Sequence, residues 1–124
     1  MAKTILLTGS ALMVLAVSIG AFGAHILKEK LAEDMMQIFK TGVEYHFYHA
    51  LGLLLVGFIS MRMPSVLINW SAILLFVGVI LFCGSLYVLS VTGLKWLGAI
   101  TPLGGLSFIA GWVLLFIAVL KSSL

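Results

Sequence analysis

The chain has 124 residues, of which 63% are hydrophobic and only 9% are charged, and its formal net charge is +3. This composition, with a mean hydropathy of +1.27, is too apolar for a soluble domain and predicts an integral membrane protein. The few basic residues are dispersed, which excludes the basic face that nucleic-acid binding needs. The single cysteine, Cys83, excludes an intrachain disulfide, and we interpret it as a buried apolar residue.

Four apolar stretches are long enough to cross a hydrocarbon layer of about 30 Å as helices, at about 1.5 Å per residue. They lie at about 5–24, 42–61, 66–89 and 101–120. Between the first two, residues 27–40 mix charged residues with an apolar stripe at helical spacing, which predicts a short amphipathic helix lying in the interface. We therefore expect an all-α fold: a single transmembrane domain over residues 1–124, built as an integral membrane four-helix bundle.

Local signals mark the starts of two of these helices. Thr41-Gly-Val-Glu44 matches the capping box, in which a hydroxyl and a carboxylate satisfy free backbone N–H groups at a helix start. Thr101-Pro102 is typical of an N-cap followed by proline in the first helical turn. The second and fourth membrane helices are therefore expected to begin close to these two threonines.

A faint internal similarity relates the first and third apolar stretches. Ser10-Ala11 and Gly23-Ala24 in the first correspond to Ser71-Ala72 and Gly84-Ser85 in the third. This pattern suggests two related helical hairpins, as in membrane proteins built from repeats.

The chain's uncommon polar side chains are expected at one end of the bundle. Because the four helices alternate in direction, the first and third end on the side of the membrane where the second and fourth begin. The candidate polar or binding cluster on that side comprises His25, Glu44, Tyr45, His46, His49, Tyr87, Lys95 and Thr101. If the protein has a site, this crowded end should hold it.

The three histidines leave several kinds of site open. His46 and His49 share a helical face, and His25 could add a third nitrogen from the facing helix, a set that suits zinc or another borderline transition metal. A histidine pair could instead ligate haem iron or bond to a quinone carbonyl. The alternative that we favour is interhelical hydrogen bonding without a cofactor, and a further one is proton handling. Glu44 is either a cap or a partner of a lysine at the rim, or a proton-carrying carboxylate.

Several longer motifs resemble those of a known family. The motifs are Gly20-Ala-Phe-Gly-Ala-His25, Tyr45-His-Phe-Tyr-His49, Gly84-Ser-Leu-Tyr87, and the run from Thr92 through Lys95-Trp96 and Thr101-Pro102 to Gly105. Together they resemble the family catalogued as domain of unknown function 423, whose eukaryotic members are called transmembrane protein 256. The resemblance implies a small multi-spanning protein of the bacterial inner membrane, or of mitochondria in animals, with no established activity.

The sequence therefore favours a non-enzymatic accessory or structural component of a membrane assembly. Its partners would be the lipid bilayer and a second copy or a larger membrane complex, without nucleic acid. The alternatives are a protein that binds a metal, haem, quinone or lipid head group at the histidine and glutamate rim, and a small oligomeric transporter or proton path. Both termini are expected on the same side of the membrane. The count of basic residues is nearly equal on the two sides, and of the two orientations we favour the one with the termini in the cytoplasm.

Overall fold

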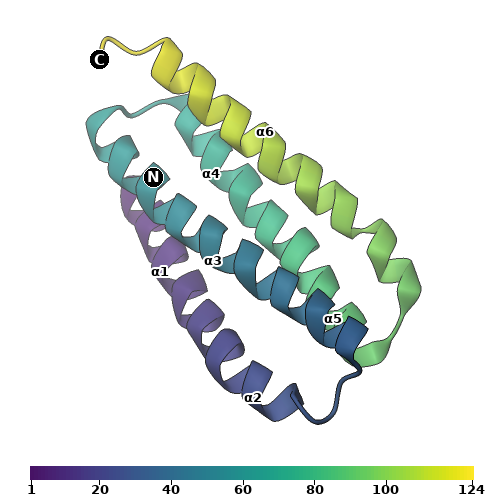
Figure 1. Cartoon of the computed structure of the whole chain (residues 1–124). Helices are drawn as coiled ribbons and strands as arrows, with labels where there is room; N and C mark the ends of the chain where they lie inside the picture. Colours follow the sequence, from purple (N-terminus) through teal and green to yellow (C-terminus); the bar gives the residue numbers. More distant parts are fainter.

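The computed structural model describes all 124 residues and is helical almost throughout (Figure 1). The first hairpin begins with one continuous helix made of α1 (Ala2–Ser18), a π-helical turn (Ile19–Gly23) and α2 (Ala24–Leu27). A short charged turn then leads into α3 (Glu33–Arg62). Two acidic residues occupy the first turn of α3, where negative charge offsets the positive end of the helix dipole.

The second hairpin has the same plan. Its first helix comprises α4 (Val66–Gly78), a π-helical turn (Val79–Cys83) and α5 (Gly84–Thr92), and a 3₁₀ turn (Lys95–Ala99) then leads into α6 (Thr101–Leu120).

Identifiable residues end and start these helices. Pro64 follows α3 and cannot continue it, because proline lacks the N–H that a helix interior needs. The Ser65 hydroxyl then accepts a hydrogen bond from the Leu67 N–H at 3.1 Å and caps α4. At the other end, Gly93 follows α5 with a φ of 74°, a conformation that glycine adopts without steric cost.

Four helices are long and apolar enough to cross a membrane, and each contains one of the ranges expected from the sequence. They are Ala2–Leu27, Glu33–Arg62, Val66–Thr92 and Lys95–Leu120. The all-α four-helix fold predicted from the sequence is confirmed. Both chain termini lie at the end of the bundle that holds the α3–α4 turn, and the other two connections lie at the opposite end (Figure 1).

The helices pack as two hairpins, α1 with α3 and α4–α5 with α6, and α3 then packs against α4 and α5. All four membrane helices contribute to one apolar core, which includes Leu12, Leu53, Leu75 and Leu115. The two helices of the second hairpin approach especially closely where Gly104 faces the backbone of Phe82, so that a Cβ at Gly104 would collide with that backbone. Lipid supplies no hydrophobic driving force between helices. Small residues at such crossings let the helices approach closely, and the resulting van der Waals contacts hold them together.

Two sequence-based expectations about helix starts are wrong. The separate interfacial helix expected over 27–40 does not form, because residues 28–32 make a turn and α3 already begins at Glu33. Thr41 therefore lies inside α3, where its hydroxyl donates to the Gln37 carbonyl at 3.0 Å instead of capping a helix. The fourth membrane helix, in contrast, does begin as expected: α6 starts at Thr101 with Pro102 in its first turn, although Ile100 and not Thr101 holds the N-cap position.

The suggested likeness of the two hairpins has a counterpart in the structure. The first helix of each hairpin contains one π-helical turn, and in each case the turn ends at or just before the small-residue pair of the internal similarity, Gly23-Ala24 or Gly84-Ser85. A π turn inserts an extra residue into the α-helical hydrogen-bond ladder, which turns the residues after it relative to those before it. This shared feature is consistent with two related hairpins.

Candidate functional site

His46 lies on α3 inside the bundle and connects it to α5. Its side chain is buried, with 3% of its surface exposed, and its Nδ1 lies 2.8 Å from the Tyr87 hydroxyl. The Tyr87 ring packs over Gly42, one turn earlier on α3, where a Cβ would lie 2.9 Å from the ring. The Nε2 atom of His46 is also buried and has no hydrogen-bond partner.

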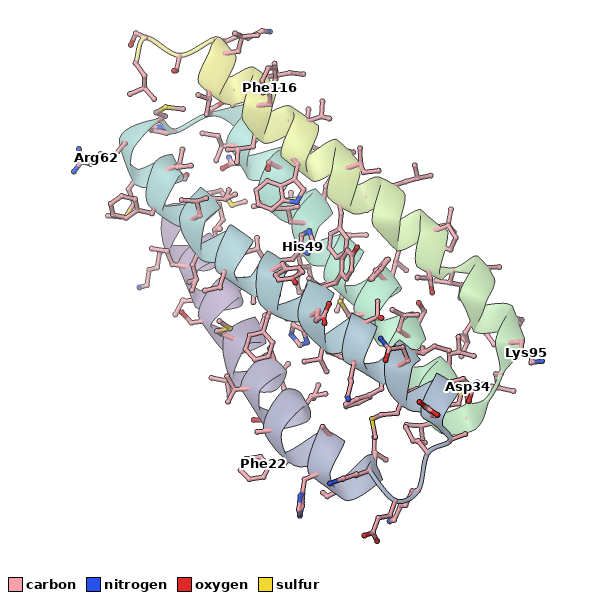
Figure 2. All side chains as sticks on the ribbon, in the orientation of Figure 1. Phe22, Asp34, His49, Arg62, Lys95 and Phe116 are labelled. Carbon is pink, nitrogen blue, oxygen red and sulfur yellow. The ribbon has the colours of Figure 1, made fainter.

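His49, one turn deeper on α3, has both ring nitrogens engaged. Its Nδ1 lies 2.8 Å from the Tyr45 carbonyl, and its Nε2 lies 3.0 Å from the indole Nε1 of Trp112 on α6. A carbonyl can only accept and an indole N–H can only donate, so this arrangement fits the neutral tautomer with its proton on Nδ1. Figure 2 shows His49 midway along the bundle, between the two ends marked by Arg62 and Asp34.

An aromatic layer surrounds His49 and joins the two hairpins. The imidazole stacks on Phe108 with a centroid separation of 3.5 Å, and Tyr45 packs against Phe82 at 4.5 Å. Phe82 in turn lies 5.5 Å from Phe108. Such ring pairs each contribute about 0.5–1.5 kcal/mol beyond simple burial. The layer therefore fixes how the second hairpin sits against the first.

The remaining candidate residues lie away from this buried pair. His25 and Glu44 are exposed, and Lys95 is exposed at the start of the 3₁₀ turn before α6 (Figure 2). Thr101 is partly buried, and its hydroxyl lies 2.6 Å from that of Ser85 on α5. His25, Lys95 and Thr101 lie at or next to the two connections opposite the termini, and the candidate residues do not form one polar cluster.

The three histidines do not converge as a metal site requires. His46 and His49 point to different partners on α5 and α6, while His25 lies on the outer surface of α2. Nowhere in the chain do three or more His, Cys, Asp or Glu side chains gather where they could hold a metal ion. The metal set His25, His46 and His49 is therefore corrected to two separate interhelical contacts and one surface histidine.

Sequence reasoning missed the partners that engage the histidines. Neither Trp112 nor Phe108 is among the candidate residues predicted from the sequence. A usable signal exists at Gly52 on α3, because a small residue one turn after His49 leaves room for a large ring. A Cβ at Gly52 would lie 2.8 Å from the edge of the Trp112 ring.

The fold and these interior contacts define a class: a small, four-helix integral membrane protein whose buried histidines are hydrogen-bonded between helices. Within that class, the chain belongs to the family described as "Protein of unknown function (DUF423)", whose model matches residues 19–105. The resemblance drawn from the sequence motifs is thereby confirmed. The matched range covers both histidines of α3 and the start of α6.

Similar proteins are named only as membrane proteins. The UPF0382 membrane protein YwdK of Bacillus subtilis is 45% identical over 120 residues, which cover 96% of this chain and 98% of that protein. UPF0382 membrane proteins of Staphylococcus haemolyticus and Staphylococcus epidermidis are 46% and 47% identical, each over 96% of this chain and 97% of the relative. No solved structure matches the chain significantly.

Proposed function

We propose that this protein is a non-enzymatic accessory or structural component of a membrane assembly in the bacterial inner membrane, with both termini in the cytoplasm. It would act through lateral contacts of its helices with a partner rather than through chemistry inside the bundle. The observation that carries the proposal is a polar pair, Glu44 and Tyr48, on the outer surface of α3. Both residues are exposed, Tyr48 with 58% of its surface.

The interior offers little room for another role. His49 is held by Tyr45 and Trp112, and His46 is held on one side by Tyr87. None of the five main hollows of the molecule is lined by either histidine. These contacts support the interpretation that the buried polar groups hold the two hairpins together.

The depth of Glu44 in the membrane supports a contact there. α3 has 30 residues and is about 45 Å long, so at most about 15 Å of it can lie outside a hydrocarbon layer of about 30 Å. Glu44 lies about 16 Å along the helix axis from Glu33. Its carboxylate is thus within or at the edge of the hydrocarbon.

An ionised carboxylate facing lipid is costly. A charged residue costs about 2.5–3.5 kcal/mol at the bilayer centre on insertion scales, and less near the interface. A partner that presents a basic or hydroxyl group to Glu44 would remove much of this cost. The phenol of Tyr48, one turn further along the same face, would extend such a contact deeper into the membrane.

Site-specific photo-crosslinking in cells tests this proposal. A photoreactive phenylalanine derivative replaces Tyr48 in one variant and Phe116, an exposed aromatic residue on α6, in the matched control (Figure 2). We expect a discrete crosslinked species from position 48 only, and a weaker one when Glu44→Leu is added. The mass of the species distinguishes a second copy from another protein.

The proposal fails if position 48 gives no discrete product, or if positions 48 and 116 give products in equal yield. It also fails if Glu44→Leu leaves the crosslink unchanged. Detergent-purified variants with unaltered helical circular dichroism establish that the substitutions act on the contact and not on the fold.

One observation favours a second candidate, the binding of a small ligand. The buried Nε2 of His46 makes no well-formed hydrogen bond, although the backbone of Leu12 on α1 approaches the imidazole, and unsatisfied buried polar groups are uncommon in native proteins. A ligand carbonyl, such as that of a quinone, would satisfy this nitrogen. An absorption spectrum, organic extraction and metal analysis of gently purified protein test this candidate, which a preparation free of any stoichiometric ligand would contradict.

A further inference from the structure

A basic hollow lies where α2 meets the start of α3, at the end of the bundle opposite the termini. It has a volume of about 260 Å³ and is lined by Ala24, His25, Lys28, Met36 and Lys40. Two of these side chains are lysines and a third is a histidine, and no carboxylate lines the hollow. The proposed accessory role does not use these residues.

Helix packing brings the basic groups together from two elements. His25 and Lys28 come from α2 and the turn after it, and Lys40 comes from the second turn of α3. The two elements lie close, because a Cβ at Gly23 would be 3.1 Å from the Phe39 ring. The hollow is therefore formed by the packing of two elements, which brings Lys28 and Lys40 to the same place.

The nearby acidic side chains lie outside the hollow and do not compensate the positive charge of its two lysines. Asp34, at the start of α3, accepts a hydrogen bond from the Met35 N–H at 3.0 Å and does not line the hollow. Glu44 lies one turn after Lys40 on α3 and is exposed outside the lining. Glu29 and Glu33 belong to the exposed turn and the first residue of α3. None of these carboxylates lines the space between the lysines.

The surrounding residues place the hollow at head-group depth. Phe22 and Ile26, on the adjoining helix, have 69% and 59% of their surfaces exposed, as expected for side chains that face lipid (Figure 2). The charged turn at residues 28–32 lies immediately beyond them. Exposed Trp96 marks the same end of the bundle, and tryptophan is enriched at the membrane interface.

We propose that this hollow binds the phosphate of an anionic phospholipid head group. Lys28 and Lys40 would pair with the phosphate charge, and the His25 imidazole would donate a hydrogen bond to a phosphate oxygen. The exposed Phe22 and Ile26 would lie against the acyl chains of the same lipid. Basic pockets between membrane helices bind anionic head groups in other proteins. With both termini in the cytoplasm, as proposed above, this hollow would face the outer leaflet and take its lipid from there.

Native mass spectrometry of the delipidated, detergent-solubilised full chain tests the proposal. Phosphatidylglycerol, phosphatidylcholine and inorganic phosphate serve as separate probes. The variant Lys28→Gln/Lys40→Gln is compared with the matched control Lys3→Gln/Lys121→Gln, which removes two exposed lysines at the opposite end. Each lysine near an anionic lipid contributes about fivefold in affinity.

We expect phosphatidylglycerol to bind more tightly than phosphatidylcholine, and the Lys28→Gln/Lys40→Gln variant to lose about 25-fold in affinity for it. The control variant and the charge-preserving Lys28→Arg should retain the affinity of the unmodified chain. Equal loss in the control would show a general effect of net charge and would overturn the proposal. Equal binding of both lipids would overturn it too, and inorganic phosphate bound as tightly as phosphatidylglycerol would reduce it to a site for a free anion.

Discussion

The contact between Trp112 and Gly52 should make two substitutions compensate each other. The edge of the indole ring occupies the space over Gly52, where a Cβ would lie 2.8 Å from one ring carbon and 2.9 Å from the next. Gly52→Ala therefore forces the ring or the helix to move, and such overpacking costs about 1–3 kcal/mol. In the background Trp112→Phe the smaller ring leaves room for the new methyl group.

The single substitution Trp112→Phe has its own cost. It removes the N–H that donates to the Nε2 of His49 at 3.0 Å. Hydrogen bonds between membrane helices contribute about 0.6 kcal/mol on average and about 1.7 at most, and the smaller ring also buries less surface. If the two changes were independent, the double variant would lose the sum of both costs.

We expect the double variant to be no less stable than Trp112→Phe alone. The coupling energy between the two substitutions would then be about 1–3 kcal/mol and would cancel the overpacking cost of Gly52→Ala. The free energies of unfolding can be measured by titrating the protein in mixed micelles with sodium dodecyl sulfate and following helical circular dichroism. Strict additivity would refute the packing of Trp112 over Gly52. A neutral Gly52→Ala in the unmodified chain would refute it as well.

Two further substitutions and one labelling experiment test the core. Ser71→Ala should lower the free energy of unfolding by about 0.6–1.7 kcal/mol, because the buried Ser71 hydroxyl donates to the Gly111 carbonyl of α6 at 2.7 Å. The matched control Ser18→Ala removes an exposed bond within one helix and should change stability by less than about 0.5 kcal/mol, so equal effects in the same titration would contradict the interhelical role. Cys83, with 1% of its surface exposed, should resist maleimide in native micelles and react once detergent unfolds the chain, and rapid native labelling would show that the core is open.

Some parts of this fold could be predicted from the sequence and others could not. The four spans could be predicted because crossing about 30 Å of hydrocarbon demands about 20 apolar residues, a signal that needs no knowledge of neighbours. The start of α3 could not, because an amphipathic stripe has the same periodicity in an interfacial helix and in a helix that continues into the membrane. Nothing between Glu33 and Glu44 breaks a helix, so α3 extends through that segment.

The candidate site, too, could be predicted only in part from the sequence. The sequence by itself determined that this is a multi-spanning membrane protein, and the alternation of its apolar spans predicted which helix ends coincide. Only the tertiary structure decided which groups meet. It pairs His49 with Trp112 across two hairpins and leaves His25 outside, beside Lys28 and Lys40. Such partners depend on how helices rotate and approach, which packing of small and large side chains decides and which helical periodicity alone does not encode.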